Sequence, residues 1–228
     1  MGMSAAPFVP DTRDLDALRR AAAECRGCEL WKNATQTVFG EGPPDADVMV
    51  AGEQPGDQED KQGRPFVGPA GGVLWRAFDR VGIAREQVYA TNVVKHFKWE
   101  ARGKRRIHKA PNRIEIVACK PWFAAELDAI TPQILVLLGA TAAKSVLGSS
   151  FRVTRQRGVV LEGPNGIPTV ATVHPSSILR SEDEGRKQAF GEFVRDLAVA
   201  AEFVSRPSRR RGPPANESRS QSSAGSQR

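Results

Sequence analysis

The stretch PQILVLLGATAAKSVLG, residues 132–148, joins an uninterrupted apolar run to a short segment with apolar residues at helical spacing. The run ILVLL is typical of a strand that is buried on both faces of a sheet. The following TAAKSVLG predicts a helix that Gly148 closes, because glycine readily adopts the backbone conformation that ends helices. A buried strand that passes directly into a helix is the repeating unit of α/β proteins, so this stretch indicates the fold class.

The same alternation extends to both sides of this stretch. We expect strands over residues 46–56, 87–94 and 132–140, and helices over residues 11–28, 67–83, 111–130, 141–148 and 182–204. Residues 151–177 are expected to form a hairpin with a PNG turn that leads into a last core strand. Such alternation favours a parallel sheet with helices on both faces. We therefore predict an α/β fold, a three-layer αβα sandwich around a mainly parallel four-stranded sheet.

Length and composition favour one domain. The 228 residues, 40% of them hydrophobic, are enough for one sizeable core and rather few for two. We expect an N-terminal extension over residues 1–10, a single domain over 11–205, and a disordered basic tail over 206–228 that is rich in Ser, Pro and Gly. The sequence contains neither a long apolar run nor a secretory signal, so we expect a cytoplasmic protein that does not contact membranes.

The positive charge is concentrated in two segments. The whole chain carries +7, while residues 206–228 carry +5 and residues 95–109 carry +6, so the remainder is slightly acidic. The second segment contains KWEARGKRRIHK, residues 98–109, which we interpret as a loop between an expected strand and an expected helix. A local basic segment in an acidic domain indicates a surface that contacts phosphates, and a solvated charged loop is the alternative.

The three cysteines, Cys25, Cys28 and Cys119, are an odd number in a chain that lacks an export signal. This count argues against a framework of disulfides. It favours free thiols or metal ligation.

Polar residues follow the expected strands at the edge where open α/β sheets bind ligands. GEQPG, residues 52–56, follows the first strand, Asn92 and the basic loop follow the second, and HPSS, residues 174–177, follows the last. Phe66 lies in a Gly/Pro-rich loop, where it either stacks on a planar ligand or caps the edge of the core. The HPSS segment has a plain alternative as a strand end with a capping serine. These turns are expected to converge on one rim of the sheet.

Four motifs in this order resemble the uracil-DNA glycosylase superfamily, specifically its iron-sulfur branch, which is called family 4. They are GEQPGDQEDKQGRPFVG at 52–68, TNVVK at 91–95, CKPW at 119–122 and HPSS at 174–177. Within this branch, Gln54 after Glu53 and the KRRIH segment, residues 104–108, resemble the UdgX type, whose members remain covalently attached to the DNA that they attack. The resemblance runs from about Cys25 to the last helix. It implies the uracil-DNA glycosylase fold and a nucleoid-associated monomer that acts on uracil-containing DNA, either single-stranded or double-stranded.

The resemblance also implies a 4Fe-4S cluster. In family 4, a CxxC pair, one residue directly after the NVVK strand and one in the C-x-P segment are the ligands, and Cys25, Cys28 and Cys119 match three of them. The fourth position is His96, where ordinary members have cysteine. Histidine replaces cysteine in Rieske centres, so Cys3His ligation is the expectation. Zinc with the same ligands, or a three-cysteine site with His96 only nearby, is the alternative.

The resemblance assigns roles to residues that would act on an extruded uracil nucleotide. Asn92 would pair with O4 and N3–H of the base, Phe66 would stack on it, and His174 would donate to the oxygen that becomes negative as the bond breaks. Glu53 and Asp57 would supply negative charge near the sugar cation. The other matching positions expected to bind substrate are Gly52, Ser176, Lys104 and Arg105.

For the UdgX type, the resemblance assigns the nucleophile to His108, the histidine that closes KRRIH. A neutral imidazole is a better nucleophile than water, and its bond to C1′ has no easy hydrolysis route. Glu53 would orient the imidazole and accept its proton, while Gln54 and Arg106 would hold the loop closed. The expectation is a suicide or very low-turnover glycosylase. Two alternatives remain: a family 4 enzyme that turns over with water, and a metal-stabilised nucleic-acid-binding module without catalysis.

Overall fold

The computed structural model describes residues 3–204, so the expected basic tail at 206–228 lies outside the described residues. Its centre is a five-stranded sheet with strand order β2-β1-β5-β7-β6. The first four of these run parallel, and β6 pairs antiparallel with β7. The strands are β1 (Val48–Gly52), β2 (Val88–Asn92), β5 (Ile134–Leu138), β6 (Val160–Glu162) and β7 (Pro168–Thr172).

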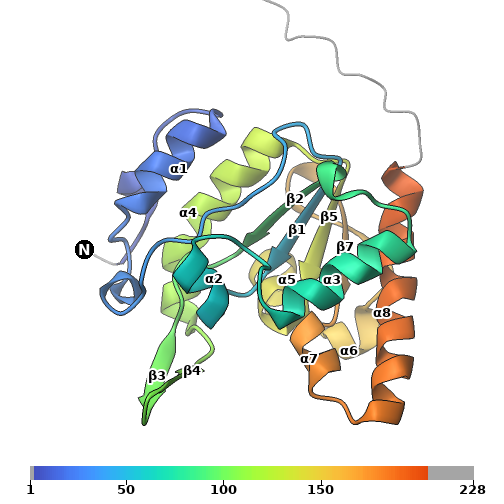
Figure 1. The fold of residues 1–228 in the computed structure, drawn as a ribbon. Helices are drawn as coiled ribbons and strands as arrows, with labels where there is room; N and C mark the ends of the chain where they lie inside the picture. Colours follow the sequence, from blue (N-terminus) through green and yellow to red (C-terminus); the bar gives the residue numbers. More distant parts are fainter. Residues whose placement is uncertain (1–2, 205–228) are drawn as a thin grey trace, which may run out of the picture.

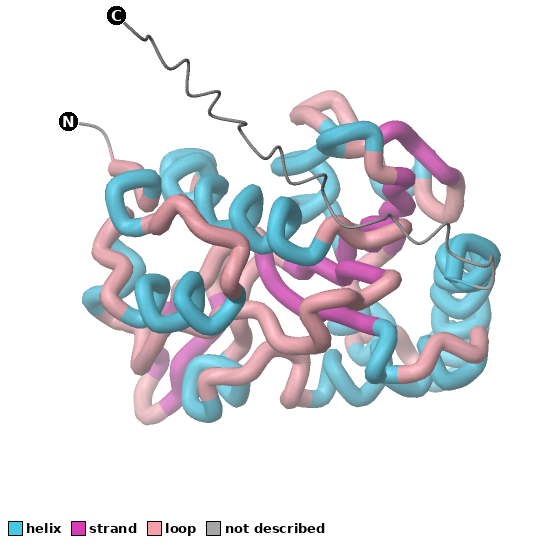
Figure 2. The backbone as a smooth tube through the Cα atoms, turned by 90° about the horizontal axis from the view of Figure 1, so that it is seen from above, coloured by secondary structure: helices cyan, strands magenta, loops and turns pink. Residues whose placement is uncertain are grey.

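Helices cover both faces of this sheet, as the alternation of elements predicted (Figures 1 and 2). One face is covered by α1 (Leu15–Ala23), α4 (Arg113–Ile130) and α5 (Gly139–Leu147), and the other by α3 (Pro69–Arg80), α7 (Pro175–Leu179) and α8 (Asp183–Val204). Side chains alternate between the two faces along each strand. In β5, Leu135 and Leu137 belong to the first core, whereas Ile134, Val136 and Leu138 belong to the second. The predicted three-layer αβα architecture is therefore confirmed.

The sheet has one strand more than the four expected. The additional strand is β6, the first arm of the hairpin that the PNG segment predicted, and this arm joins the sheet edge beside β7. Short elements that the sequence did not predict also appear. They are α2 (Asp57–Gln62), α6 (Val153–Gln156), and 3-10 turns at Ala6–Phe8, Glu29–Lys32, Arg85–Gln87 and Pro164–Gly166.

The first helix is shorter than expected at both ends, because it spans Leu15–Ala23 instead of residues 11–28. Its N-cap is Asp14, whose side chain accepts hydrogen bonds from two backbone N–H groups. After the helix, the chain passes close to the N-terminal residues. A Cβ at Gly27 would lie only 2.6 Å from Ala5 Cα, so a side chain does not fit there. The N–H of Ala5 in turn donates to the carbonyl of Ala118 in α4. The Cys25–Cys28 turn is thus packed between the N-terminal segment and α4.

The basic segment interpreted as a loop is in fact a two-stranded antiparallel hairpin, formed by β3 (Trp99–Arg102) and β4 (Arg105–His108). It projects from the lower left of Figure 1, outside the central sheet. The strands are joined by Gly103 and Lys104, and the positive φ of Gly103 suits a tight two-residue turn. Trp99 and His108 are paired across the hairpin and therefore share one of its faces.

Within residues 3–204, none of the helices is both long enough and apolar enough to cross a membrane.

Candidate active site and metal centre

Three predicted site residues converge over Gly52, the last residue of β1. A Cβ at this position would lie 2.5 Å from Asn92 Oδ1, 3.0 Å from Phe66 Cζ and 3.6 Å from His174 Nε2. No residue with a side chain fits there without displacing Asn92. Gly52 is therefore required by close approach, and the turns after β1, β2 and β7 meet at one rim as predicted.

Phe66 is held in a conformation that its residue type rarely adopts. Its φ is 52°, in the left-handed region, and its side chain is buried. The indole N–H of Trp75 donates to the Phe66 carbonyl at 3.1 Å, and a Cβ at Gly71 would overlap that carbonyl at 1.9 Å. The N-terminal part of α3 thus imposes this strained backbone, a feature that is common at binding sites. The ring lies 6.5 Å from that of His174, with 29° between the planes.

His174 presents an N–H group to this site. The backbone N–H of Ser176 donates to His174 Nδ1 at 3.2 Å, and the Ser176 hydroxyl lies 2.9 Å from the same nitrogen. A backbone N–H can only donate, so Nδ1 accepts and the proton of the neutral ring resides on Nε2. Burial, with smaller contributions from the charges of His108 and Arg180, lowers the pKa of His174 to about 4. The imidazole is therefore neutral at pH 7, and its Nε2–H faces Gly52.

His108 and Glu53 lie at the outer side of the same rim. His108 Nε2 is 3.5 Å from Glu53 Oε1, which is longer than a normal hydrogen bond. The His108 side chain is 51% exposed, whereas that of Glu53 is 20% exposed. The Phe97 ring lies 6.0 Å from the imidazole ring. The carboxylate therefore faces one ring nitrogen, while half of the His108 side chain is open to a ligand.

Gln54 fastens both ends of the hairpin. Its amide group donates to the carbonyls of Lys98 and Lys109, at 3.2 and 3.1 Å, and its oxygen accepts from the N–H of Lys98 at 3.3 Å. Lys98 directly precedes β3 and Lys109 directly follows β4. Because Gln54 adjoins Glu53, the segment after β1 sets the position of His108 relative to the carboxylate. The prediction that Gln54 holds this segment closed agrees with these contacts.

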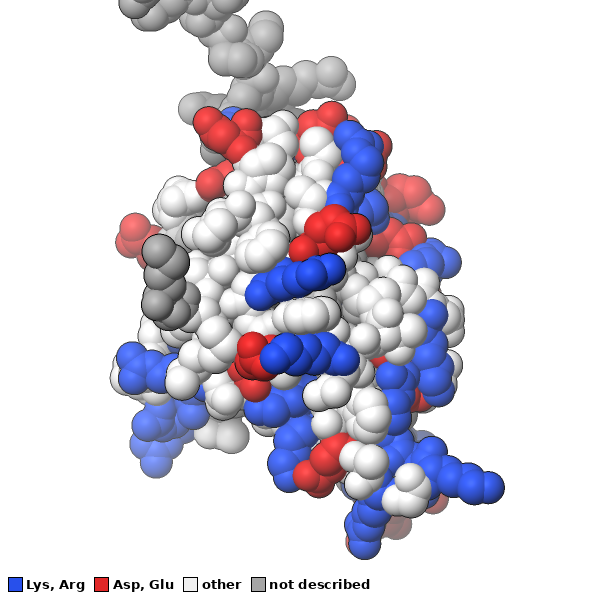
Figure 3. Space-filling model, turned by 90° about the vertical axis from the view of Figure 1, so that its left-hand side faces the viewer, with Lys and Arg blue, Asp and Glu red and all other residues white. Residues whose placement is uncertain are grey.

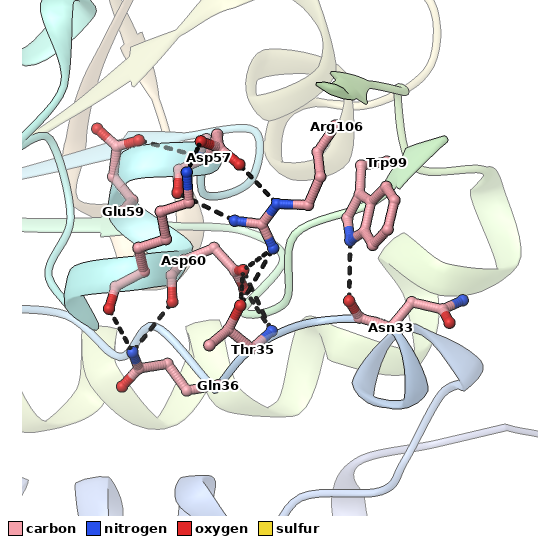
Figure 4. Close-up of polar contacts among 10 residues, drawn as sticks. Asn33, Thr35, Gln36, Asp57, Glu59, Asp60, Trp99 and Arg106 are labelled. Carbon is pink, nitrogen blue, oxygen red and sulfur yellow. Dashed lines mark hydrogen bonds and ion pairs between the residues drawn. The ribbon is translucent and has the colours of Figure 1, made fainter. Parts of the chain in front are cut away.

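Arg106 joins the hairpin to α2 (Figure 4). Its guanidinium contacts Asp57 Oδ1 at 2.6 Å and Asp60 Oδ2 at 2.7 Å, and it also donates to the Thr35 hydroxyl at 3.1 Å. The side chains of Lys61 and Arg106 lower the pKa of Asp57. Asp57, expected to supply charge near the sugar, thus has its carboxylate engaged by two cations.

Replacing Arg106 with Ala is expected to lower the free energy of unfolding by about 3 kcal/mol, because fully buried Asp60 then loses its charged partner. Arg105→Ala, on the exposed face of the same strand, should cost less than about 0.5 kcal/mol. Urea unfolding of both variants, followed by circular dichroism, measures the difference. Equal stabilities for the two variants would contradict the anchoring role of Arg106.

Within residues 3–204, the Lys and Arg side chains at the tip and outer face of the hairpin form no contacts like those of Arg106 with α2. Arg102, Lys104 and Arg105 are exposed. Figure 3 shows Lys and Arg side chains gathered at the lower end of the face that includes the hairpin. Such a basic projection beside a rim of polar groups suits contacts with a phosphate backbone.

Cys25 and Cys28 lie near Cys119, where the Cys25–Cys28 turn packs against α4. All three are free and buried. Burial raises the pKa of Cys28, and the charge of Cys25 adds to this shift. Burial raises the pKa of Cys119 to about 12, against the opposing charge of Lys95, and the charges of Cys28 and Cys25 add to the rise. The backbone N–H of Lys95 donates to Cys119 Sγ at 3.3 Å. Metal binding would deprotonate such thiols, and N–H donors to sulfur are a usual feature of iron-sulfur sites.

His96 borders the same cavity as Cys25, which has a volume of about 160 Å³. The Thr37 hydroxyl has one hydrogen and donates it to the Ala22 carbonyl at 2.9 Å. The Thr37 oxygen must therefore accept from His96 Nε2–H, at 2.8 Å, which leaves the lone pair on Nδ1. Burial lowers the pKa of His96 to about 4, so this ring is neutral at pH 7. A neutral imidazole fixed through its other nitrogen is the state in which histidine binds metals.

The donor types thus fit a soft metal or a cluster. Within residues 3–204, however, no three His, Cys, Asp or Glu side chains are already gathered at metal-binding distances.

Sequence reasoning missed the residues that support the site from a distance. Asp60 was an unremarked part of a turn, and the buried pair formed by Lys95 and Glu126 was not foreseen. No local pattern identifies these partners, because Arg106 and Asp60 are 46 positions apart and Lys95 and Glu126 are 31 apart. The one available signal was the presence of charged residues inside segments expected to be buried.

Comparison with known proteins places this rim in a family. Residues 39–198 match the family model described as the uracil DNA glycosylase superfamily. The type-4 uracil-DNA glycosylase of Sulfurisphaera tokodaii is 36% identical over 195 residues, covering 81% of this chain and 85% of the relative. That of Thermotoga maritima is 33% identical over 191 residues, covering 83% and 94%. That of Pyrobaculum aerophilum is 34% identical over 194 residues, covering 82% and 92%. The rim over Gly52 therefore lies within the matched region, and the chain belongs to the uracil-DNA glycosylase superfamily.

Proposed function

We propose that this protein is a uracil-DNA glycosylase that excises uracil and then captures the sugar C1′ through His108. The observation that carries the proposal is the position of His108, 3.5 Å from Glu53 at the rim that also holds Asn92, Phe66 and His174. Uracil stacks on Phe66 and pairs with Asn92. As the bond between C1′ and the base breaks, its electron pair goes to the base, and His174 Nε2–H donates to the uracil oxygen that gains negative charge.

The second part of the proposal concerns the fate of the sugar cation. A ring nitrogen of His108 supplies the electron pair of the new bond to C1′. Glu53 offsets the positive charge that the imidazole gains or accepts its proton. Gln54 and Arg106 hold the hairpin in place for this attack, and the cations of the hairpin grip phosphates. The product is a protein-DNA adduct with no ready hydrolysis route, which makes the protein a suicide or very low-turnover enzyme.

A second candidate is a turnover-competent type-4 enzyme in which water captures the cation. It is favoured by the relatives, whose printed names say type-4 uracil-DNA glycosylase and nothing of an adduct. In that case the hairpin only binds DNA, and His108 contributes one more contact with a phosphate.

A denaturing gel separates the candidates. The purified chain is incubated with a labelled oligonucleotide that contains one uracil, beside a thymine control. A slow band that resists SDS and heat, formed only with uracil, supports the adduct. Strand cleavage after alkali without that band supports the enzyme that uses water. If neither signal appears, only the nucleic-acid-binding module remains.

We also propose that Cys25, Cys28, His96 and Cys119 hold a 4Fe-4S cluster. The buried thiols, the N–H of Lys95 on Cys119 and the free Nδ1 of His96 support this ligand set. These four residues would hold the cluster so that it ties the Cys25–Cys28 turn to His96 and α4, and base excision would need no redox step from it.

Protein purified without oxygen should be brown and contain about four iron atoms per chain. Oxidative loss of the iron should lower the melting temperature, because the Cys25–Cys28 turn loses its tie to α4. Metal analysis and thermal unfolding before and after treatment test this expectation. A colourless protein with one zinc per chain would instead establish the zinc alternative.

A further inference from the structure

A buried ion pair lies next to Asn92, behind the rim over Gly52. Lys95, three residues after the end of β2, contacts Glu126 of α4, and their side chains are 1% and 0% exposed. Charged groups are rarely buried so completely unless all their hydrogen-bonding capacity is used.

The ammonium group of Lys95 holds the backbone of the residue expected to recognise the base. Its three N–H groups match three acceptors: the carbonyl of Asn92 at 2.7 Å, the hydroxyl of Thr91 at 2.7 Å, and the carboxylate of Glu126. Asn92 is the last residue of β2, and its side chain reaches over Gly52. The cation therefore fixes the peptide from which that side chain projects.

Glu126 extends this contact to other parts of the fold. Its carboxylate accepts from the N–H of Gly40 at 2.8 Å, from the hydroxyl of Tyr89 at 3.1 Å, and from the hydroxyl of Thr91 at 2.9 Å. One side chain thus ties β2 and the segment before β1 to α4. Because the single hydrogen of Thr91 points to Glu126, its oxygen is free to accept from Lys95.

The same residue also reaches the cysteine site. The backbone N–H of Lys95 donates to Cys119 Sγ at 3.3 Å, and Cys119 lies seven residues before Glu126 in α4. The side chain of Lys95 thus contacts β2, which ends in Asn92, and its backbone N–H contacts the cysteine site.

We propose that Lys95 and Glu126 are positioning residues that hold Asn92 in register with Phe66 and His174. The inference rests on the proposed excision of uracil and adds to it a buried pair that touches no part of the substrate. Cleavage needs the base held at a defined angle to the His174 donor, and a displacement of about 1 Å costs roughly 100-fold in rate. DNA affinity comes from the hairpin instead, so the pair controls the cleavage step and leaves DNA binding unchanged.

The test compares two variants of the pair with a matched control, all in the full chain. Lys95→Met combined with Glu126→Gln removes both charges together. Thr91→Val removes only the hydroxyl that links them and is the milder change if the double variant folds poorly. The control is Asp47→Asn, whose carboxylate accepts from Gln87 and Gln133 at the opposite edge of the same sheet. For each protein, the rate of uracil release at saturating protein, the Kd for a matched oligonucleotide with thymine in place of uracil and the melting temperature are measured.

The expected result is a fall in the rate of uracil release of about 100-fold in the double variant and about tenfold in Thr91→Val, with Kd within about threefold of the parent. Asp47→Asn should lower only the melting temperature. If the parent releases uracil and each test variant that folds releases it at the parental rate, the positioning role is overturned. The proposed function still stands in that case. A parent that releases no uracil overturns both.

Discussion

The His108→Ser variant should form no covalent adduct with uracil-containing DNA, while still releasing uracil. The adduct yield is expected to fall at least about 100-fold, because an unactivated serine hydroxyl is a far weaker nucleophile than a neutral imidazole. Pairing with Asn92 and donation by His174 do not involve position 108, so cleavage of the base should persist. The smaller side chain also leaves room for water beside Glu53, which converts a suicide reaction into hydrolysis with turnover.

The measurement is a denaturing gel for the adduct and a chromatographic assay for free uracil, applied to the same samples. Lys104→Ser provides the matched control, because it changes a basic residue at the tip of the same hairpin. The control should retain the adduct and show a smaller salt dependence of binding, since one phosphate contact is lost. A persistent, uracil-dependent adduct in His108→Ser would assign the nucleophile to another residue.

The His174→Gln variant should lower the rate of uracil release by about 100-fold to 1,000-fold, which is the usual cost of removing one preorganised donor to a developing anion. Since the pKa of His174 is lowered to about 4, the ring is neutral throughout the range from pH 5 to pH 8. In the proposed reaction it would therefore act as a hydrogen-bond donor through Nε2–H and not as a cation.

Nitrogen NMR of the free protein at pH 6 tests this state of the ring directly, because Nδ1 should appear unprotonated and Nε2 protonated. For the kinetics, Ser181→Ala is a suitable control, since its hydroxyl bonds only within the segment that follows His174. An unchanged rate in His174→Gln would show that the leaving uracil is stabilised by another group.

Strand and helix positions were predictable because they depend on local patterns. The run Ile134–Leu138 is apolar on both faces, and such a run in an α/β chain is typical of an inner strand. The convergence of Glu53, Asn92 and His174 followed from a topological rule, since the carboxyl ends of parallel strands share one edge. The motif resemblance then supplied roles that no pattern alone gives.

The missed features depend on contacts between distant segments. Half of the eight residues in the hairpin strands are charged, and the hairpin is held by Gln54 and by the contacts of Arg106 with α2. Burial of Asp60 and Glu126 is tolerable only because their cationic partners arrive from elsewhere in the chain. Local hydropathy argues against burying such residues, so sequence patterns point away from these two pairs.

The hairpin that carries His108 could be transferred to another protein as a unit. The two ends of the hairpin are adjacent, with the N–H of Lys109 bonded to the carbonyl of Lys98 at 3.0 Å. Residues 99–108 could therefore be excised and the chain rejoined without rebuilding any strand of the central sheet. The proposed covalent capture would in this sense be a detachable module, and a host that supplied Gln54, Asp57 and Asp60 in the same places could receive it.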